Sequence, residues 1–345
     1  MEKVFKDAQM NARYSRQIIF PEIGSEGQKR LNSSYAVIIG CGALGTVTAS
    51  ALVRAGVGRV RIIDRDYLEY HNLQRQILFD EDDIRNNLPK AIAAERHLKK
   101  VNSEVLVEGI VADVNYQTVE KLVEGADVIL DGLDNYETRL LINDVALKHN
   151  TPWIYGGAIG ASGMTMTFIP QRTACFRCIF SGQVRQGQVL TCDTAGVISP
   201  APWVIGAIQS AKALKVLLQP AKINPNLLII DLWRNEFASL RVKPYPACPA
   251  CQGNYEYLSG KSGTRTASLC GQNAIQVLPS NSKQITFAEL AARLKPLGEV
   301  AYNEYMLTFR ADSHEILVFP DARAIVKNTT DEALARGLYA RYIGA

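Results

Sequence analysis

The stretch YAVIIGCGALG at residues 35–45 decides the fold of this chain. Residues 35–39 have the length and composition of a buried strand, and the glycine-rich turn after them leads into an apolar helix. Gly40, Gly42 and Gly45 allow the backbone to approach a phosphate at the positive end of that helix. The stretch therefore predicts a nucleotide-phosphate site in an α/β domain.

Strands and helices alternate along the chain on either side of this turn. We expect strands at 35–40, 59–64, 104–111, 127–131 and 153–155, and helices at 25–32, 43–56, 89–101, 116–123 and 136–149. This alternation predicts a Rossmann-like, mostly parallel sheet with right-handed crossovers. Antiparallel strands should extend it, at 163–170 and 227–243, around an apolar helix at 201–218.

The last part of the chain has a pattern of its own. Residues 1–255 are expected to form the main domain, 256–270 a linker rich in Gly, Ser and Thr, and 271–345 a small α+β domain. In that small domain we expect strands at 274–278, 304–311 and 314–320, and helices at 286–296 and 331–342.

Composition excludes several classes of protein. The 345 residues are 47% hydrophobic and 21% charged, which is ordinary for a soluble globular protein. The net charge of +4 is too small and dispersed to indicate nucleic-acid binding. No stretch approaches the roughly 18 apolar residues of a membrane span, and the start of the chain lacks the apolar core of a signal peptide. We therefore expect a cytoplasmic protein without membrane or nucleic-acid partners.

Four of the seven cysteines form two CxxC pairs, Cys175 with Cys178 and Cys248 with Cys251. Four thiolates at this spacing can complete a tetrahedral Zn²⁺ site that pins distant segments together. Paired disulfides and redox-active CxxC motifs are the alternatives, and a reducing compartment disfavours the disulfides.

Charged and amide residues after the glycine turn suggest roles beyond phosphate cradling. Asp64, at the end of the second strand, is placed to accept hydrogen bonds from a ribose; the alternative is a solvated carboxylate. Arg75 lies in a polar loop, 72–76, whose guanidinium and amides suit a polyphosphate, although surface arginines are common. Lys90 begins a helix, where its ammonium group and the free N–H groups of the helix start could face the same anion. The alternative is an ordinary surface lysine.

Acidic residues and one further cysteine complete the candidate set. Asp131 and Asp134 follow a buried strand together with Asn135, and a carboxylate with phosphate oxygens can hold Mg²⁺. Capping of the next helix is the alternative role. Cys192 precedes a helix whose dipole would lower the pKa of its thiol, so it is either reactive or inert.

Together these motifs resemble the ThiF/MoeB/HesA family, relatives of the adenylation domains of ubiquitin-activating enzymes. The resemblance covers residues 11–255 and rests on an ordered set of pieces: residues 13–17 (RYSRQ), the glycine turn, Asp64, residues 72–76 (NLQRQ), Pro89-Lys90, Asp134-Asn135, both CxxC pairs and residues 191–197.

The resemblance implies the role of each site residue. ATP would lie across the glycine turn with its ribose on Asp64. The remaining nucleotide contacts would come from Asn72, Arg75, Gln76, Lys90 and Asn135, with Asp134 holding Mg²⁺. Arg16 would reach into the site of a partner subunit, which implies a homodimer, and Cys192 would be a candidate for a covalent link to the substrate.

The implied reaction is adenylation of the C-terminal carboxylate of a ubiquitin-like sulfur carrier ending in Gly-Gly, in thiamine or molybdopterin biosynthesis. The stretch 156–163 would be a channel for the carrier's thin tail, because glycine allows close approach. Residues 271–345 contain no cysteine, so a sulfur-transferring rhodanese is not expected there.

Three alternatives stay open. An NAD-dependent oxidoreductase would use the glycine turn and Asp64 but leave Arg75, Lys90 and Asp134 without a role. A non-catalytic zinc-stapled scaffold could bind a carrier without activating it. Within the family, the activated carboxylate could belong to a tRNA-bound group or a peptide.

Overall fold

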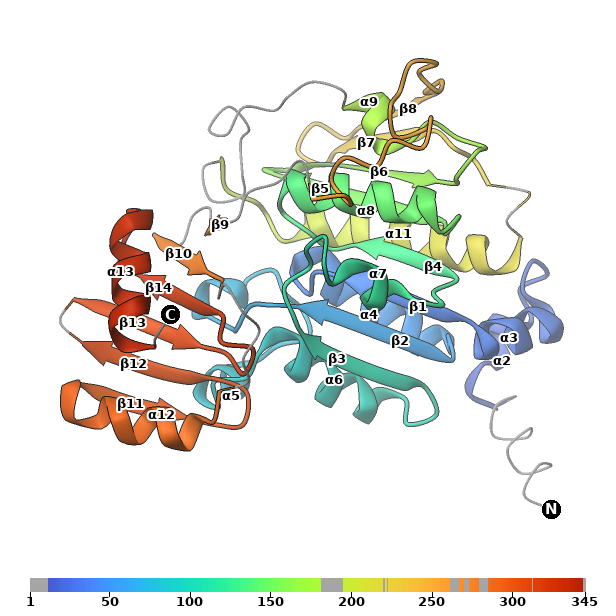
Figure 1. Cartoon of the computed structure of the whole chain (residues 1–345). Coiled ribbons are helices and arrows are strands. Elements are labelled where there is room, and N and C mark those ends of the chain that lie inside the picture. The colour runs from blue at the N-terminus through green and yellow to red at the C-terminus, as the bar shows by residue number, and fades with distance from the viewer. Residues whose placement is uncertain are drawn as a thin grey trace. The chain divides into compact units, whose positions relative to one another are not determined.

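The computed structural model describes residues 12–180, 195–219, 221, 223–260, 267–269, 273–278, 285–311 and 313–343. The chain divides into two compact units (Figure 1). Unit 1 comprises Met1–Asn86 and Lys90–Ser262, and unit 2 comprises Asn87–Pro89 and Gly263–Ala345.

Unit 1 is built on an eight-stranded sheet with the order β3-β2-β1-β4-β5-β6-β7-β8. Its strands are β1 (Tyr35–Ile39), β2 (Arg59–Asp64), β3 (Leu106–Val111), β4 (Val128–Asp131), β5 (Trp153–Ile159), β6 (Ser162–Phe168), β7 (Leu227–Asp231) and β8 (Glu236–Leu240). The pairs among β1 to β5 are parallel, and β6, β7 and β8 join in antiparallel fashion. The predicted fold class is confirmed.

Helices cover both faces of this sheet, as Figure 1 shows. The described helices are α2 (Ser15–Ile18), α3 (Gly24–Ser33), η1 (Tyr70–Asn72), α4 (Ala43–Ala55), α5 (Glu81–Arg85), α6 (Lys90–Val101), α7 (Val119–Val123), α8 (Tyr136–Lys148), α9 (Phe176–Ile179) and α11 (Pro200–Leu218). Helix α11 packs on α4, β5 and β6. On the other face, apolar side chains of α7 and α8 join the core around Trp153. Burial on both faces explains why β1 is apolar throughout.

The glycine turn is held by close backbone packing. Gly40 has a φ of +92°, which favours glycine. A Cβ on Gly45 would lie 2.0 Å from the Gly40 carbonyl oxygen, and one on Gly132 would lie 2.2 Å from the same atom. The start of α4 and the chain after β4 can therefore approach the turn only because these positions lack side chains.

Several predicted boundaries differ from the structure. The expected strand 227–243 is the hairpin of β7 and β8, which turns at the Asn235 backbone with a φ of +57°. The expected linker 256–270 is partly structured: Leu258 is buried in the core of unit 1, and Ala267–Leu269 forms strand β9. Gly, Ser and Thr content indicated a linker there, but it reports neither burial nor strand pairing.

Unit 2 is an antiparallel sheet of six strands with helices packed on it. The sheet has the order β11-β12-β13-β14-β10-β9. Its elements are β9, β10 (Ala274–Val277), α12 (Phe287–Leu294), η3 (Lys295–Leu297), β11 (Glu299–Tyr302), β12 (Leu307–Ala311), β13 (His314–Val318), β14 (Ala324–Lys327) and α13 (Glu332–Tyr342). Side chains of α12 and α13 form its core with alternate strand residues such as Leu307 and Phe309. The sequence missed β9, β11 and β14, each of three or four residues.

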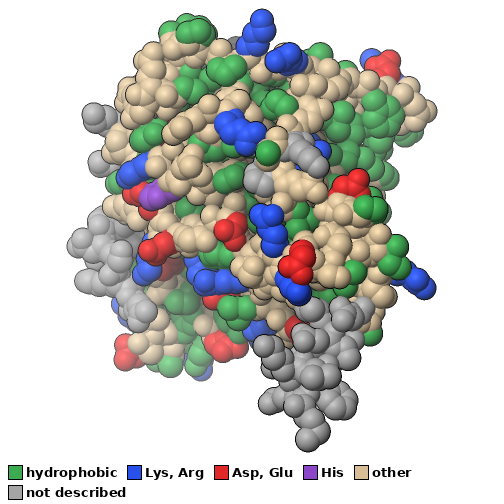
Figure 2. All heavy atoms as spheres, turned by 90° about the vertical axis from the view of Figure 1, so that its right-hand side faces the viewer, with side chains coloured by type: hydrophobic (Ala, Val, Ile, Leu, Met, Phe, Trp, Pro, Cys, Tyr) green, Lys and Arg blue, Asp and Glu red, His purple; other side chains and the backbone are tan. Residues whose placement is uncertain are grey.

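Charges on the face drawn in Figure 2 are mixed: where grey atoms do not cover it, Lys and Arg side chains lie among acidic and apolar ones. Among the described residues, no helix combines the length and apolar character needed to cross a bilayer.

Candidate functional site

Three strand ends meet at the carboxyl edge of the parallel sheet. Ile39 of β1 pairs in register with Ile63 of β2 and with Asp131 of β4, so the glycine turn lies between Asp64 and the chain after Asp131. Ligands of doubly wound sheets bind at this edge. The predicted site residues Gly40, Asp64 and Asp134 therefore belong to one region of unit 1.

Asp64 fixes the glycine turn from the side of β2. Its Oδ2 accepts a hydrogen bond of 2.6 Å from the Cys41 N–H, and its Oδ1 accepts one of 2.7 Å from the Asp66 N–H. Burial raises the pKa of Asp64, and the positive charge of Lys90 partly offsets this effect. Each carboxylate oxygen retains a second lone pair, so the predicted ribose contact is compatible with these bonds.

Lys90 is a buried cation rather than a surface lysine, with 5% of its area exposed. Its Nζ lies 3.1 Å from the Asp66 carboxylate, and its backbone N–H donates to the Asp66 carbonyl. Burial opposes its charge, but Asp66 and Asp64 raise the pKa of Lys90 above its ordinary value. The ammonium group is therefore held charged beside the glycine turn.

The loop 72–76 is shaped by its own hydrogen bonds. The Asn72 side chain accepts a hydrogen bond from the Glu69 N–H and so caps η1, a structural role not predicted from the sequence. Arg75 donates through Nη1 to the His71 carbonyl at 2.9 Å. Gln76 is buried, and its Nε2 lies 4.0 Å from where a Cβ on Gly42 would be. The amide of Gln76 is thus next to the glycine turn.

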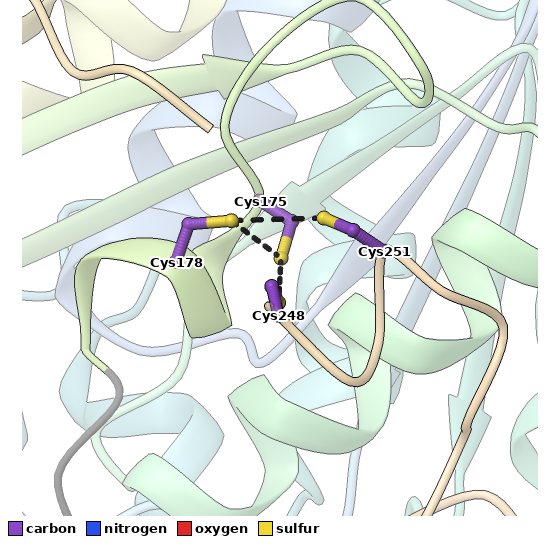
Figure 3. Close-up of side chains that lie close together, drawn as sticks. All are labelled: Cys175, Cys178, Cys248 and Cys251. Atoms are coloured by element: carbon purple, nitrogen blue, oxygen red, sulfur yellow. Dashed lines mark hydrogen bonds between the residues drawn. The ribbon is translucent and has the colours of Figure 1, made fainter. Parts of the chain in front are cut away.

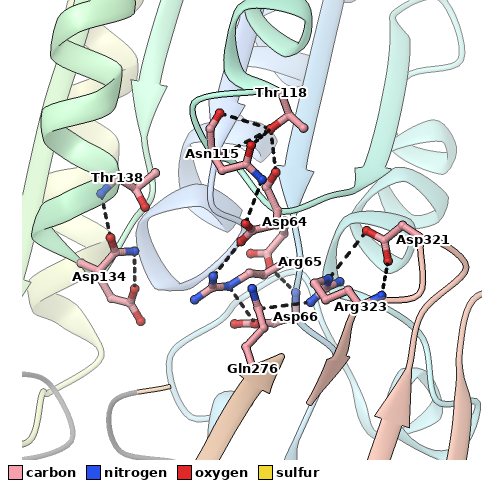
Figure 4. Close-up of polar contacts among 12 residues, drawn as sticks. Asp64, Arg65, Asp66, Asn115, Thr118, Asp134, Thr138, Gln276, Asp321 and Arg323 are labelled. Carbon is pink, nitrogen blue, oxygen red and sulfur yellow. Dashed lines mark hydrogen bonds and ion pairs between the residues drawn. The ribbon is translucent and has the colours of Figure 1, made fainter. Parts of the chain in front are cut away.

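Asp134 and Asn135 follow β4, and Figure 4 labels Asp134 together with Thr138 of α8. Asp134 is exposed, and its Oδ1 lies 3.5 Å from the Asn135 Nδ2. Asn135 caps α8, because its Oδ1 accepts from the Thr138 N–H at 2.9 Å. The residue that caps α8 is therefore Asn135 rather than either aspartate, whereas the Asp134 carboxylate is exposed and accessible to a cation.

Sequence reasoning missed three charged residues at this edge. Arg65, with its Nη1 2.7 Å from Asp113, and Asp66 directly follow Asp64 (Figure 4). Arg139 of α8 forms a buried ion pair with Asp131, with Nε 2.8 Å from Oδ2. The available signals were the run of charges after β2 and a lone arginine in an α8 segment whose neighbours are mostly apolar.

Asp131, one of the two aspartates considered for Mg²⁺, is instead paired with Arg139. The Asp131 carboxylate accepts from the Arg139 guanidinium and from the Leu133 N–H, and it is fully buried. Arg139 also donates to the carbonyls of Leu133 and Gly156. Asp131 therefore holds the loop that carries Asp134, and of the two carboxylates only that of Asp134 is exposed.

Two glycines of the predicted tail channel at 156–163 have a packing role. A Cβ on Gly156 would lie 2.4 Å from the Gln209 side chain, and one on Gly163 would lie 2.4 Å from Ile205. These two glycines allow α11 to pack against the sheet. Gly160, with a φ of +60° at the β5–β6 turn, borders open space, because a Cβ there would have no atom within 4 Å.

Arg16 lies away from this edge within one chain. It is exposed on α2, and the neighbouring Gln17 donates to the carbonyl of Ala55 at the far end of α4. Helix α4 has 13 residues and begins at the glycine turn, so these two ends are roughly 20 Å apart. Cys192 lies outside the described residues.

The four CxxC cysteines converge in space, as Figure 3 shows. Their sulfur atoms all lie within 4.8 Å of one another, and three pairs are 3.6 Å apart. Zn–S bonds of about 2.3 Å in a tetrahedron place the sulfurs about 3.8 Å apart. The cluster therefore fits Zn²⁺ and joins α9 to the segment near residue 250, although 73 residues separate Cys175 from Cys248.

The fold and the site together define a doubly wound α/β protein with a glycine-rich turn and a buried lysine at the ligand-binding edge of the sheet. It belongs to the ThiF family, whose model matches residues 14–250. The family resemblance of the motifs is confirmed.

Curated relatives are similar over most of their length. The sulfur carrier protein ThiS adenylyltransferase of Bacillus subtilis is 44% identical over 97% of this chain and 100% of its own length. The Escherichia coli protein of the same name is 35% identical over 70% of this chain and 95% of its own length. By this relationship the chain is an enzyme, an adenylyltransferase.

Solved structures agree with the fold. Escherichia coli MccB, crystallised with ATP, has a TM-score of 0.60 and 26% identity, covering 69% of this chain and 74% of MccB.

Proposed function

We propose that this enzyme uses ATP and Mg²⁺ to adenylate the C-terminal glycine carboxylate of a ubiquitin-like sulfur carrier and releases pyrophosphate. The observation that carries the proposal is the buried, charged Lys90 beside Asp64 at the glycine turn. A nicotinamide dinucleotide needs no such cation, whereas a triphosphate does. An NAD-dependent oxidoreductase is correspondingly disfavoured.

The residues present can hold ATP in one arrangement. The glycine turn and the start of α4 would take the phosphates, and Asp64 would take the ribose. Arg75, Gln76 and Lys90 would neutralise and orient the triphosphate, with Asn72 and Asn135 shaping the loops on either side. The exposed Asp134 carboxylate would hold Mg²⁺, which supplies positive charge to the phosphate oxygens.

The reaction needs positioning and charge neutralisation rather than a base. A carboxylate oxygen of the carrier attacks the α-phosphorus of ATP and forms an acyl–phosphate bond. The bond between the α-phosphorus and its bridging oxygen breaks, and the electron pair leaves with pyrophosphate. A terminal carboxyl has a pKa of about 3.5, so it is already ionised at neutral pH. Lys90 and Arg75 would stabilise the charge that moves onto the leaving group.

The relationship to the Bacillus subtilis enzyme favours a ThiS-like carrier. That relative matches 97% of this chain, a span that includes unit 2, whereas the Escherichia coli relative matches 70%. A MoaD-like carrier is the alternative within the same chemistry. A peptide substrate is a second candidate because several MccB structures contain MccA, although MccB is 26% identical or less in most of them.

The proposal also covers a structural Zn²⁺ ion, a homodimer and a role for Cys192. The cysteine cluster would hold one Zn²⁺ per chain as a structural ion, because its sulfur spacing fits a tetrahedron. The enzyme would be a homodimer in which Arg16 of each subunit serves the partner's site, since Arg16 lies away from its own. Cys192 would be available for a covalent step after adenylation without being needed for it.

Mass spectrometry of the carrier tests the proposed product. Incubation with the enzyme, ATP and Mg²⁺ should add one adenylyl group to a ThiS-like carrier and none to a carrier lacking its last two glycines. Modification of a MoaD-like carrier alone would move the assignment to molybdopterin biosynthesis. Modification of a peptide but of neither carrier would contradict the proposal.

A further inference from the structure

Two hydrogen bonds tie the loop 72–76 to the segment that opens α11. The indole Nε1 of Trp203 donates to the carbonyl oxygen of Arg75 at 2.8 Å. The Nε2 of Gln74 donates to the carbonyl oxygen of Val197 at 3.4 Å. The backbone of the arginine assigned to the triphosphate is therefore held from outside its own loop.

The same segment is also bonded to the β5–β6 turn. The Gly160 N–H donates to the Gly196 carbonyl at 2.8 Å, and the Ile198 N–H donates to the Gly160 carbonyl at 3.0 Å. Gly160 and Val197 form a parallel bridge. One short piece of chain, residues 196–203, thus contacts both the Arg75 loop and the open β5–β6 turn at Gly160.

On its opposite side the loop meets the glycine turn. The amide of Gln76 lies beside Gly42, and the N–H groups of Arg75 and Gln76 both donate to the Asn72 carbonyl. These bonds fix the loop locally but leave its distance from α11 unspecified. The Trp203 bond supplies that restraint at the residue whose side chain would meet the triphosphate.

The indole of Trp203 is not used for core packing in the way that Trp153 is. Trp203 has 38% of its area exposed, whereas Trp153 is fully buried among aromatic rings. Its most specific contact is the hydrogen bond to Arg75. A phenylalanine at this position would keep an aromatic ring and lose the donor.

We infer that Trp203 is a positioning residue for ATP: its indole N–H holds the Arg75 backbone so that the loop meets the triphosphate without first being ordered. The inference rests on the proposed function. Removal of the N–H should weaken ATP binding in the ground state and transition state alike, which raises KM and leaves kcat unchanged.

Kinetics of ATP–pyrophosphate exchange by the full-length enzyme test this inference. Trp203→Phe should raise the KM for ATP about three- to ten-fold, the effect of one lost hydrogen bond, with kcat within about two-fold. Trp233→Phe is the matched control, because Trp233 is 80% exposed at the β7–β8 turn, and its KM should equal that of the wild type. A KM unchanged in Trp203→Phe, or a loss confined to kcat, would overturn the inference.

A second variant and a binding measurement separate a failure of the inference from a failure of Trp203→Phe to fold. Gln74→Ala removes the other bond between the loop and the segment before α11 and should raise the KM in the same direction by a smaller factor, even if Trp203→Phe fails to fold. Calorimetric titration with ATP reports binding without catalysis. Absence of exchange in the wild type would contradict the proposed function, whereas equal ATP affinity of wild type and variant would contradict the role of Trp203.

Discussion

Lys90 and Asp134, the two residues proposed to meet the Mg²⁺-bound triphosphate, differ in burial at the carboxyl edge of the sheet. Lys90 is buried and paired with Asp66, so its charge is fixed in place before any ligand arrives. The Asp134 carboxylate is exposed, so it is accessible from solvent to the proposed Mg²⁺. A preorganised cation and an accessible carboxylate are the two groups that a metal-bound triphosphate needs.

Replacement of Asp134 should therefore abolish the chemistry without disturbing the fold. We expect Asp134→Ala to reduce ATP–pyrophosphate exchange by at least about 100-fold, because loss of one group that stabilises transition-state charge typically costs that much. Asp82→Ala, at an exposed carboxylate of α5, is the control and should retain full exchange. Cys192→Ala should also retain it. Substantial exchange by Asp134→Ala would show that the metal ligand is misassigned.

Asp144 gives the enzyme a pH dependence of stability. Its Oδ2 accepts hydrogen bonds from the Tyr257 and Leu258 N–H groups, and burial raises its pKa to about 6. The unfolded chain has a pKa near 3.9 at this residue, so the folded state binds the proton more tightly. This group therefore stabilises the fold below about pH 4 and loses that contribution as the pH rises through 6.

An Asp144→Asn variant isolates this effect, because asparagine can accept the same bonds without ionising. Between pH 4 and 7.5, the free energy of unfolding of the variant relative to the wild type should increase by about 2 kcal/mol. Denaturant titrations of both proteins at the two pH values measure it. A difference that does not change with pH would show that Asp144 ionises normally.

At the scale of elements, the glycine turn joins β1, α4 and the chain after β4 through backbone contacts. Gly45→Ala would place a Cβ 2.0 Å from the Gly40 carbonyl oxygen, so α4 or the turn must move. Gly42 has a φ of −84°, and a Cβ there would meet its nearest atom at an ordinary 3.7 Å. The two glycines therefore have different roles.

We expect Gly45→Ala to lower the free energy of unfolding by about 2–4 kcal/mol, in the range for overpacked sites. Gly42→Ala should fold with nearly normal stability but bind ATP more weakly, because its methyl group would lie near the Gln76 amide at the proposed phosphate site. Thermal unfolding and ATP titration of both variants distinguish these effects. Equal stability of the two variants would contradict the packing argument.

The elements that the sequence predicted are those with a repeated local pattern. The parallel strands, such as β1, and the long helices, such as α4, follow from apolar runs and glycine positions. The short strands of unit 2, such as the four-residue β14, are too brief for an alternating pattern to be recognised, and the β7–β8 turn at 232–235 contains neither Gly nor Pro. The buried state of Lys90 and the pairing of Arg139 with Asp131 are tertiary properties, which no local pattern reports.

For the whole molecule, the position of Arg16 is the feature with the largest consequence. It lies at the opposite end of α4 from the glycine turn, so the proposed contribution of Arg16 to catalysis requires a second copy of the chain. A symmetric dimer gives each site one Arg16 from the partner.

Mixed dimers test this arrangement. Arg16→Ala and Asp134→Ala homodimers should each be inactive. After the subunits have exchanged, half of the dimers are mixed, and each mixed dimer has one intact site out of two. About a quarter of all sites should therefore be intact. The ATP–pyrophosphate exchange activity of the mixture should therefore recover to about a quarter of the wild-type value, while each variant alone stays inactive. No recovery after verified mixing would contradict a contribution of Arg16 to the partner's site.

The central claim, that this site activates a carboxylate with ATP, is tested most directly by ATP–pyrophosphate exchange of the wild-type enzyme. Radioactive pyrophosphate should enter ATP when the enzyme, Mg²⁺ and a carrier ending in Gly-Gly are all present. Removing the two glycines should stop it. Tight binding of NAD with no exchange in the presence of any carrier would contradict the account.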